Sequence, residues 1–286
     1  PLPLLPDPVR FAVDDVRRQI VRAGGALGRS ASAARSRLLS RLPAGAARTA
    51  IDCALWDLEA RQRRCSVARL AGLPEPQATR TCFTLSLDTP EAMAAAARAA
   101  AAVSILKLKL GADDDAQRMR AVRASRPDAR LLVDANEGWT VDQLQPLVAV
   151  AAECAIELIE QPLPAGDDMV LSEISLPVPV CADEAAAPDI DIRSLSPRYD
   201  AVNIKLDKAG GLTHALALIR HARSCGLRIM LGSMVSTSLS MAAAMQLAAL
   251  ADWVDLDSPM LLARDRTAGL KIRDGWLTPP RKQLWG

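Results

Sequence analysis

The stretch RLLVDANEGW (130–139) shows the pattern that decides the fold of this chain: an apolar run of strand length that ends in a charged residue and is followed by polar and turn-forming residues. The same pattern returns on both sides of it, in SILKLKL (104–110), AIELIEQP (155–162), VPVCADE (178–184) and DAVNIKLDKAGG (200–211). The intervals between successive strand ends are 22 to 26 residues, which is close to one strand plus one helix. This order predicts repeated β–α units with parallel strands. The charged residues at the five strand ends are Lys109, Asp134, Glu160, Asp183 and Lys205.

Eight strands and seven intervening helices are expected in this part of the chain. Beyond the five stretches above, the strand candidates are TCFTLSL (81–87), LRIMLGS (227–233) and DWVDLD (252–257). The alternation predicts an α/β fold, a (β/α)₇β TIM-like barrel. The carboxyl ends of its strands share one face, the mouth, where active sites form. The predicted helices begin near Glu91, Asp113, Thr140, Asp167, Pro188, Gly211 and Ser236.

The first part of the chain is expected to be a smaller, largely helical region. Within residues 12–72, AVDDVRRQIVRA (12–23) and PAGAARTAIDCALWDLEARQ (43–62) are typical of helices, the second by the spacing of its apolar residues. The proline-rich segment GLPEPQATR (72–80) then predicts a boundary. We therefore expect three parts: residues 1–78, the barrel over residues 79–264, and a C-terminal segment over residues 265–286 that packs back on the first part.

The overall composition argues against several classes of protein. A chain of 286 residues with 50% hydrophobic residues can bury a sizeable core, and 35 basic against 33 acidic residues leave a formal net charge of +2. With 3% aromatic residues, neither a basic groove nor a stacking surface for nucleic acid is indicated. No apolar run reaches the roughly 18 residues of a membrane span. The six cysteines show no metal-ligand spacing and are typical of reduced thiols in a cytoplasmic protein.

Three carboxylates at consecutive strand ends, Asp134, Glu160 and Asp183, predict a divalent-metal site at the mouth. Magnesium favours sites made of oxygen ligands and usually keeps positions open for substrate oxygens. Any one of these carboxylates could equally cap a helix or form a surface ion pair, but three in succession are hard to explain in that way. Their polar neighbours Asn136, Gln161 and Glu184 are expected to hold the ligands in place through hydrogen bonds.

Two lysines on one strand point to proton-transfer chemistry. Lys107 and Lys109 are one residue apart, so both side chains point into the mouth, and Lys205 lies four strands further round the ring. Two lysines that face each other across a metal-bound carboxylate suit removal of an α-proton by one and delivery of a proton to the opposite face by the other. A KLK stretch can also protect an exposed sheet edge, but an interior barrel strand has no such edge. His214 and His221 share one predicted helix away from the strand ends and are expected to be packing or surface residues.

Asp255 and Asp257, in DWVDLDSP (252–259), alternate on the last predicted strand and should point to the same side. Two carboxylates that face the mouth and are not needed for the metal could receive a cationic group of the substrate. The alternative is that one of them caps the loop or pairs with an arginine. The other residues that we expect to contact the substrate are Lys107, Ser233 and Met234.

The ordered set KLK, DANEGW, IEQP, ADE and NIKLDKAGG, followed by LGSMVSTS and DLDSP, resembles the muconate-lactonizing subgroup of the enolase superfamily. Within it, the likeness is closest to L-Ala-D/L-Glu (dipeptide) epimerases and runs from about residue 40 to about residue 262. The resemblance also implies a partial N-terminal α+β capping domain, here expected without its first strands. It implies a role for each matching residue: binding of one Mg²⁺ ion per subunit by Asp134, Glu160 and Asp183, acid/base catalysis by Lys109 and Lys205, and binding of a dipeptide's free ammonium group by Asp255 and Asp257.

The function that we expect from this resemblance is Mg²⁺-dependent dipeptide epimerisation. It is a 1,1-proton transfer at the α-carbon through an enediolate intermediate, on Ala-Glu or a related peptidoglycan dipeptide. Ser258 stands where the family usually has a glycine, and Ser236 where many members have an acidic residue, and these two departures bear on the substrate preference. The alternatives are a cycloisomerase, an o-succinylbenzoate synthase or an N-acylamino acid racemase of the same superfamily, or an inactive metal-binding fragment without its lid. The aspartate pair argues against the first two, whose substrates carry no free ammonium.

Overall fold

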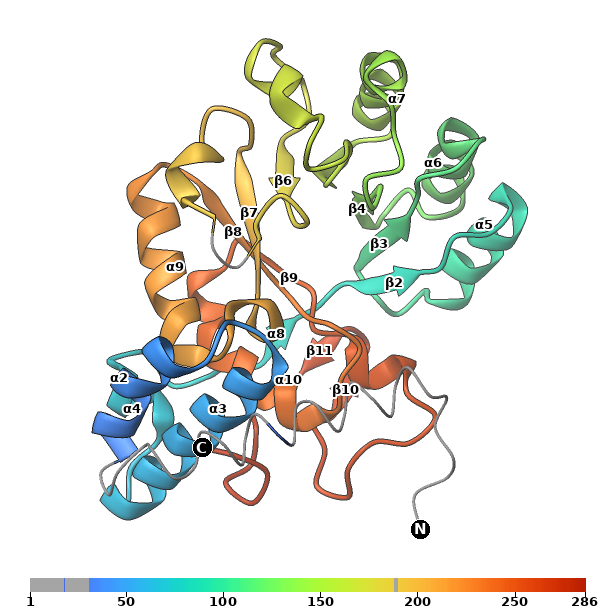
Figure 1. The fold of residues 1–286 in the computed structure, drawn as a ribbon. Coiled ribbons are helices and arrows are strands. Elements are labelled where there is room, and N and C mark those ends of the chain that lie inside the picture. Colours follow the sequence, from blue (N-terminus) through green and yellow to red (C-terminus); the bar gives the residue numbers. More distant parts are fainter. Residues whose placement is uncertain (1–17, 19–30, 188–189) are drawn as a thin grey trace.

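The computed structural model describes residue 18, residues 31–187 and residues 190–286, and its centre is one sheet of eight parallel strands that follow each other in chain order (Figure 1). The sheet curls, and Cys82 N beside the first strand donates to Val254 O in the last strand at 3.0 Å, so the two edges meet. The eight predicted strands and the α/β barrel class are confirmed. In order, the strands are β2 (Phe83–Leu85), β3 (Ile105–Lys109), β4 (Arg130–Asp134), β5 (Ile156–Glu160), β6 (Val180–Ala182), β7 (Ala201–Lys205), β8 (Arg228–Gly232) and β9 (Trp253–Val254).

Most connections between the strands are helices that pack on the outer face of the sheet (Figure 1). Their starts follow the sequence: Thr89 accepts a hydrogen bond from Ala92 N ahead of Pro90, and Thr140 and Gln143 form a capping box. The helices are α5 (Pro90–Ala99), α6 (Asp115–Ser125), α7 (Val141–Glu153), α8 (Leu206–Ala209), α9 (Leu212–Ser224) and α10 (Ser238–Ala244), with 3₁₀ helices at Met245–Leu250 and Ser258–Leu261.

Two of the seven predicted helices are wrong. After β5 and β6 the described chain forms only the short 3₁₀ helices Asp168–Ser172 and Ile192–Ser194, and the predicted start near Pro188 lies outside the described residues. The cause is visible in the connection over residues 161–179, which holds four prolines. Proline has no N–H to donate and disfavours helical conformation in the residue before it. These two connections therefore cover less of the sheet than a full helix would.

Within described residues 31–78, three helices precede the barrel: α2 (Ala31–Arg41), α3 (Ala46–Arg63) and α4 (Val67–Ala71). They confirm the helical character expected there, whereas the helix predicted over residues 12–23 lies outside the described residues except for Arg18. The C-terminus ends beside these helices (Figure 1), and Trp285 Nε1 donates to Cys53 O of α3 at 3.1 Å.

A small antiparallel sheet joins the start of the barrel to the C-terminal segment. Its strands are β1 (Thr79–Arg80), β10 (Ile272–Arg273) and β11 (Trp276–Leu277), and β11 pairs with both of the others. The predicted division of the chain at residues 78 and 264 is not tested by these contacts and stays a prediction.

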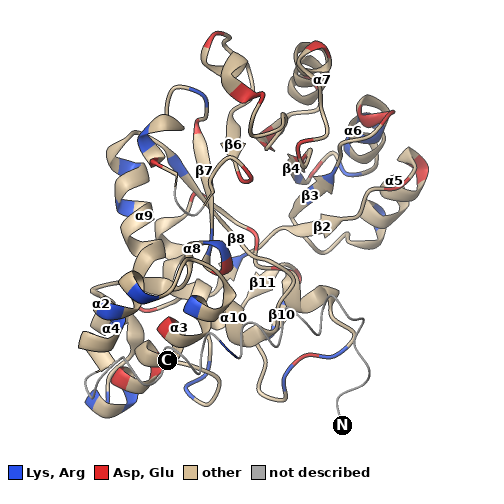
Figure 2. Ribbon diagram, viewed as in Figure 1, with Lys and Arg blue, Asp and Glu red and all other residues tan. Residues whose placement is uncertain are grey.

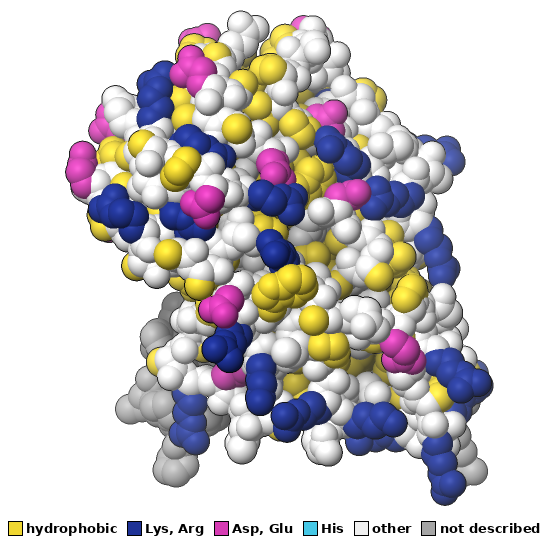
Figure 3. Space-filling model, turned by 180° about the vertical axis from the view of Figure 1, so that it is seen from behind, with side chains coloured by type: hydrophobic (Ala, Val, Ile, Leu, Met, Phe, Trp, Pro, Cys, Tyr) yellow, Lys and Arg dark blue, Asp and Glu magenta, His cyan; other side chains and the backbone are white. Residues whose placement is uncertain are grey.

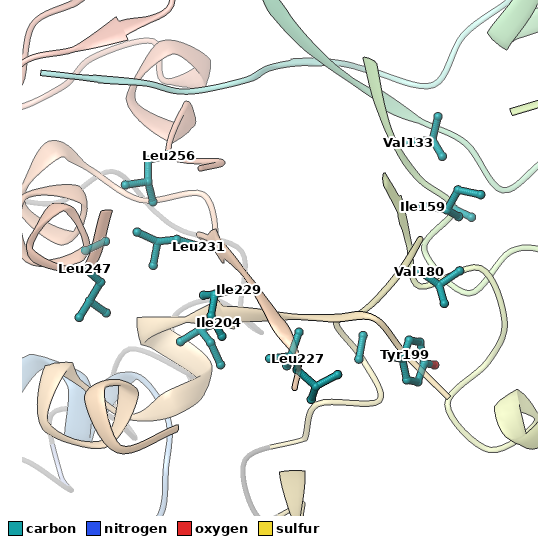
Figure 4. Close-up of a cluster of buried hydrophobic side chains, with 14 of the residues drawn as sticks. Val133, Ile159, Val180, Tyr199, Ile204, Leu227, Ile229, Leu231, Leu247 and Leu256 are labelled. Carbon is teal, nitrogen blue, oxygen red and sulfur yellow. The ribbon is translucent and has the colours of Figure 1, made fainter. Parts of the chain in front are cut away.

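Side chains alternate between the two faces of each barrel strand and so sort into layers. Those that point outward pack beneath the helices, as Figure 4 shows for Val133, Ile159, Ile204, Ile229 and Leu231. Those that point inward near the amino ends of the strands form a separate buried apolar cluster, here called the floor layer, which consists of Cys82, Ile105, Leu132, Leu158, Cys181, Ala201, Met230 and Trp253.

The next inward-facing positions, two residues further along each strand, are almost all polar. We call them the site layer: Thr84, Lys107, Asp134, Glu160, Asp183, Asn203, Gly232 and Asp255. The floor layer therefore seals the amino end of the barrel with apolar side chains, and the chemistry lies directly above it, toward the mouth.

The outer surface is mixed in charge. On the face seen in Figure 3, Lys and Arg side chains are spread over the surface with Asp and Glu side chains among them. Within the described residues, no helix combines the length and the hydrophobicity needed to traverse a bilayer.

Candidate active site

Lys107 lies at the centre of the site layer and contacts three carboxylates. Its Nζ atom is 3.0 Å from Asp134 Oδ2, 2.6 Å from Glu160 Oε2 and 2.8 Å from Asp255 Oδ2. The side chain is only 3% exposed. Figure 2 shows the acidic and basic residues of β3 and β4 close together at the strand ends. Lys107 is thus an internal counter-ion that draws carboxylates at three different strand ends toward one point.

Lys109 is two residues further along β3 and is more accessible. Its Nζ atom donates to Asp134 Oδ2 at 2.6 Å and to Asn136 Oδ1 at 2.9 Å, and 33% of its side chain is exposed. Asn136 in turn donates its backbone N–H to Asp134 Oδ1 at 3.1 Å, with φ at +45°, a region that asparagine tolerates better than most residues. Two acceptors therefore direct an ammonium group that a ligand in the mouth can reach.

On the opposite side of the mouth, two lysines share one carboxylate. Lys205 Nζ donates to Asp183 Oδ2 at 2.7 Å and lies 4.0 Å from Glu160 Oε1. Lys208 Nζ donates to Asp183 Oδ1, also at 2.7 Å. Both oxygens of Asp183 are thus held by an ammonium group, and Asn203 Nδ2 donates to Glu160 Oε1 at 2.7 Å.

These contacts set the charge of the site layer. Burial raises the pKa of Asp134, but attraction to Lys107 and the neighbouring lysine outweighs it and lowers the pKa to about 2. For Glu160 the balance is reversed, because burial and the negative charges of Asp134 and Asp183 raise its pKa to about 7. Burial lowers the pKa of Lys107, yet the carboxylates around it raise the pKa well above its ordinary value. An additional cation beside Glu160 would therefore favour its ionised form.

The donor set of the site layer fits Mg²⁺, which prefers carboxylate oxygens. Glu160 Oε2 is buried and accepts no hydrogen bond, although Lys107 forms an ion pair with it. Over the part of the chain that the structure describes, no three His, Cys, Asp or Glu side chains are grouped as a metal site, and ammonium groups lie between the carboxylates. Mg²⁺ would compete with these ammonium groups for Asp134, Glu160 and Asp183, whose role as its ligands stays a prediction.

Neither Asp255 nor Asp257 lies on a strand, which corrects the prediction. Strand β9 ends at Val254, and Asp257 begins a 3₁₀ helix with φ −79° and ψ −5°. Pro259, at the start of that helix, has its φ fixed near the helical value and so favours the turn. The alternation of side chains between the two faces, which holds along a strand, therefore ends between the two aspartates.

Both aspartates nevertheless face the mouth and have partners. Besides Lys107, Asp255 accepts a hydrogen bond from Cys82 Sγ at 2.9 Å. Asp257 Oδ2 accepts one from Thr84 N at 2.7 Å. Burial, together with the negative charge of Asp255, raises the pKa of Asp257 to about 6. Within the described residues, Lys107 thus forms its ion pair with Asp255 and not with Asp257.

The site layer opens into a cleft of about 300 Å³. One wall is apolar and exposed: Met234, Val235 and Leu261 have 48%, 69% and 47% of their surface accessible. Ser233, next to this wall, donates from Oγ to Asp255 O at 3.3 Å. The predicted substrate-binding residues Ser233 and Met234 thus line the same cleft as the charged groups. The cleft is bounded by Thr84, Lys107, Lys109, Asn136, Asp183, Glu184, Lys205, Lys208, Ser233, Met234, Val235, Asp255, Asp257, Ser258 and Leu261.

Gln161 is fully buried beside Glu160 and organises the neighbouring strand end. Its Oε1 atom accepts from Asp183 N at 2.8 Å and from Ala185 N at 3.0 Å. Its Nε2 atom donates to Leu163 O at 2.8 Å and to Tyr199 Oη at 3.0 Å. The Oε1 atom therefore fixes the backbone that carries Asp183, while the Nε2 atom ties the amide to Leu163 and Tyr199.

Glu184 lines the cleft but makes weaker connections. Its Oε2 atom is buried without a hydrogen-bond partner, and burial and the charge of Asp183 raise its pKa above the ordinary value. Within the described residues, Glu184 forms no hydrogen bond with Asp134, Glu160 or Asp183. The hydrogen-bond support that we predicted from Glu184 is therefore not seen in this structure.

Sequence reasoning missed several residues of this site. Asn203 lies two residues before Lys205 on the same strand, so strand alternation could have identified it. Thr84 and Cys82 could have been found by the same rule on the first strand. Lys208, which sequence reasoning did not place in the site, contacts Asp183 because α8 turns it back toward the mouth. His214 and His221 lie on α9, away from the strand ends, as expected.

Two protein-family models match the chain. Residues 12–72 match the mandelate racemase/muconate lactonizing enzyme N-terminal domain, and residues 91–283 match the enolase C-terminal domain-like family.

The sequence is also similar to curated enzymes. It is 45% identical over 252 residues to an N-acetyl-D-glutamate racemase from a Pseudoalteromonas species, covering 88% of this chain and 79% of the relative. It is 44% identical over 245 residues to the L-Ala-D/L-Glu epimerase of Escherichia coli K12, covering 85% and 76%.

Solved structures show the same fold. An enolase family member from Agrobacterium tumefaciens with homology to dipeptide epimerases, determined with bound sodium and L-Ala-L-Glu, superposes with a TM-score of 0.89 at 45% identity, covering 96% of this chain and 82% of that chain. A dipeptide epimerase from Methylococcus capsulatus, complexed with Mg and the dipeptide L-Arg-D-Lys, gives a TM-score of 0.84 at 32% identity, covering 93% and 80%.

Proposed function

The chain belongs to the mandelate racemase/muconate lactonizing enzyme family of the enolase superfamily, and from that membership we propose that it is a Mg²⁺-dependent dipeptide epimerase. It is an isomerase that inverts the α-carbon of the C-terminal residue of a dipeptide such as Ala-Glu. The similarity to the L-Ala-D/L-Glu epimerase and to dipeptide-bound relatives supports this substrate class.

One observation carries the proposal: Lys109 and Lys205 reach the mouth from opposite sides. They end β3 and β7, which are four strands apart in a ring of eight. A planar carbanion-like centre between them would present one face to each lysine, so one can remove the α-proton while the other delivers a proton to the opposite face. Epimerisation needs this opposition, whereas an elimination needs only one base.

The site layer would hold the metal through Asp134, Glu160 and Asp183, with Lys107 and Asn203 keeping the carboxylates in place. Mg²⁺, when bound, supplies positive charge next to the substrate carboxylate and so lowers the cost of removing the neighbouring α-proton. The floor layer excludes water from below, which keeps the electrostatic contacts of the site strong.

Asp257 supports a substrate with a free ammonium group. It is 4% exposed, and Thr84 donates hydrogen bonds to its carboxylate, so a cation at the cleft wall would stabilise its charged form. Met234, Val235 and Leu261 would lie against the aliphatic parts of the dipeptide.

A second candidate, racemisation of an N-acylamino acid, is favoured by a specific contact. Asp255 is already neutralised by Lys107, so the aspartate pair offers a substrate cation one uncompensated carboxylate instead of two. The 45% identity to an N-acetyl-D-glutamate racemase points the same way. The two candidates share the lysines and the metal ligands and differ only in the group that Asp257 meets.

A direct test compares L-Ala-L-Glu with N-acetyl-L-glutamate as substrates in deuterated water with Mg²⁺, following α-deuteration and inversion by NMR. A kcat/KM at least tenfold higher for the dipeptide is expected. A preference for N-acetylglutamate would establish the second candidate, and the absence of α-proton exchange with both compounds would contradict the reaction class.

We also propose a cytoplasmic location. All six cysteines are free thiols in the structure, which is typical of a reducing compartment.

A further inference from the structure

The segment that follows Lys205 has an arrangement that cannot be stable by itself. Lys205 is followed at once by α8, a single helical turn of four residues, and then by Gly210 and Gly211 before α9 begins. One turn of helix is far below the length at which helices are stable alone, and apart from Leu206 O, which accepts from Gly210 N at 2.8 Å, its carbonyl groups need partners from outside the turn. Something else must therefore hold this segment in place.

Arg48 and Thr49 of α3 supply partners for the carbonyl groups of this segment. Arg48 is buried, with Nη2 donating to Ala209 O at 2.7 Å and Nε donating to Gly210 O at 3.2 Å. Thr49 Oγ1 donates to Leu206 O at 2.9 Å. Two side chains of one helix thus cap the carboxyl end of α8.

Asp52, one turn further along α3, caps the start of α9. Its Oδ2 atom accepts from Thr213 N at 2.9 Å, and its Oδ1 atom accepts from Thr213 Oγ1 at 2.6 Å. The residue at the N-cap position of α9 itself, Gly211, has no side chain for this task. Asp52 is 1% exposed, and Trp56 Nε1 adds a bond to Thr213 Oγ1 at 2.9 Å.

The two glycines show how closely α3 approaches. Both have positive φ values, +78° at Gly210 and +110° at Gly211. A Cβ on Gly210 would lie 2.3 Å from Arg48 Nε, and one on Gly211 would lie 2.5 Å from the Asp52 side chain. The backbone at Gly210 and Gly211 therefore packs against the side chains of α3 with no space for a Cβ atom.

The other side of α8 faces the active site. Lys205 and Lys208 flank the turn, and their Nζ atoms bind the two oxygens of Asp183. A shift of α8 away from α3 would therefore move both ammonium groups, whereas Lys109 on β3 is held by Asp134 and Asn136 on the other side of the mouth. We name Arg48, Thr49 and Asp52 the α3 clamp.

We propose that the α3 clamp positions Lys205 and Lys208, so that the helical region before the barrel sets the geometry of one of the two proton-transfer groups. The inference rests on the proposed function for its catalytic readout only. The clamp residues are positioning residues, since they contact α8 and α9 and not the reacting atoms. A merely structural role, in which α3 only adds to overall stability, would affect both sides of the mouth equally.

The test compares Asp52→Asn with Glu59→Gln. Both changes replace a buried carboxylate of α3 by its amide, but Glu59 pairs with Arg35 and Arg63 and does not contact residues 205–213. Each variant is incubated with the two epimers of the substrate separately in deuterated water, and initial α-proton exchange is followed by NMR. Lys109→Ala and Lys205→Ala assign each epimer to one lysine.

For Asp52→Asn we expect exchange of the epimer that faces Lys205 to slow at least tenfold, while exchange of the other epimer changes less than twofold. Glu59→Gln should leave the ratio of the two rates unchanged. If Asp52→Asn does not fold, Thr49→Val replaces it, because it removes one clamp bond at constant shape and should change the ratio at least threefold. Equal slowing of both epimers overturns the proposal.

A second measurement does not depend on turnover. Reductive methylation of the protein, followed by peptide mass spectrometry, gives the labelling rate of Lys205 relative to Lys109. Release of Lys205 from Asp183 should raise this ratio at least threefold in the clamp variants and not in Glu59→Gln, and an unchanged ratio overturns the proposal. Absence of exchange by the parent protein would contradict the proposed function instead, and the labelling ratio alone would then decide on the clamp.

Discussion

Asn203 and Gly232, on the neighbouring strands β7 and β8, share one space inside the barrel. A Cβ on Gly232 would lie 2.4 Å from Asn203 Oδ1, although the backbone conformation of this glycine is not one that requires glycine. Asn203 uses this space to donate a hydrogen bond to Glu160. The absence of a side chain at residue 232 thus allows the amide to hold a site carboxylate.

Gly232→Ala should therefore impair the site more than the fold. The new methyl group displaces the Asn203 amide from Glu160, and we expect kcat/KM to fall at least tenfold while the free energy of unfolding falls by about 1–3 kcal/mol. Steady-state kinetics and urea unfolding measure the two effects. Gly166→Ala is the matched control, because a Cβ there meets nothing within 4 Å. Equal activity in the two variants would contradict the steric argument.

Single substitutions of the two lysines should separate the two half-reactions. Lys109→Ala and Lys205→Ala are each expected to abolish epimerisation, yet each should retain α-proton exchange for the epimer that faces the remaining lysine. NMR in deuterated water with each pure epimer provides the measurement. Interconversion of both epimers by either variant would show that the two-base arrangement is wrong.

Replacing one predicted metal ligand should weaken Mg²⁺ binding. Asp183→Asn removes a negative charge that Lys205 and Lys208 now compensate, and we expect Mg²⁺ affinity to fall at least tenfold and turnover to fall below detection. Isothermal titration calorimetry with Mg²⁺ alone tests the first part. Treatment of the parent protein with a chelator should abolish activity and Mg²⁺ should restore it; full activity in the chelator would exclude a metal requirement.

Tyr199→Phe should lower stability through a buried network. Tyr199 Oη donates to Asp168 Oδ2 at 2.7 Å and accepts from Gln161 Nε2 at 3.0 Å, so its loss leaves buried polar atoms with fewer partners. We expect the variant to unfold with a free energy lower by about 1–3 kcal/mol. Urea unfolding at pH 7 is the measurement, and a change within experimental error would mean that water replaces the hydroxyl group.

The same tyrosine gives a prediction on pH. Burial and the hydrogen bond to Asp168 raise the pKa of Tyr199 above its ordinary value. A group whose pKa is raised on folding contributes stability that is complete below the unfolded pKa, about 10 for tyrosine, and is lost above it. The stability difference between the parent protein and Tyr199→Phe should therefore be constant from pH 6 to roughly pH 9 and shrink at higher pH. A difference that grows above pH 10 would contradict this assignment.

The barrel and the position of the site could be predicted because both depend on strand alternation. Once a strand is placed, every second residue points inward, and Lys107, Asp134 and Glu160 come to one layer without any further information. Beyond the end of a strand, alternation no longer predicts the direction of a side chain. That is why the prediction placed Asp257 on a strand, although it lies at the start of a 3₁₀ turn, and why it did not include Lys208 of α8 among the site residues.

The contacts of α3 could not be predicted for a different reason. From the sequence alone, Arg48 and Asp52 are indistinguishable from ordinary polar residues of an amphipathic helix. Their partners at residues 206–213 are far away in sequence. Only the docking of α3 on the barrel brings them together. The two missing helices after β5 and β6 were predictable in principle, since prolines mark those connections, but strand-to-strand spacing alone still allowed a helix.

The wide sequence separation within the α3 clamp has a consequence for synthesis of the protein. Asp52 precedes Thr213 by 161 residues, so at about 5–20 residues per second a ribosome needs roughly 8–30 s between the two. Trp285, which donates to Cys53, arrives later still. Until then the apolar side of α3, including Trp56 and Ala60, has no barrel to pack against. We therefore expect the nascent chain to depend on chaperones that shield this helix, and the yield of folded protein to follow their supply.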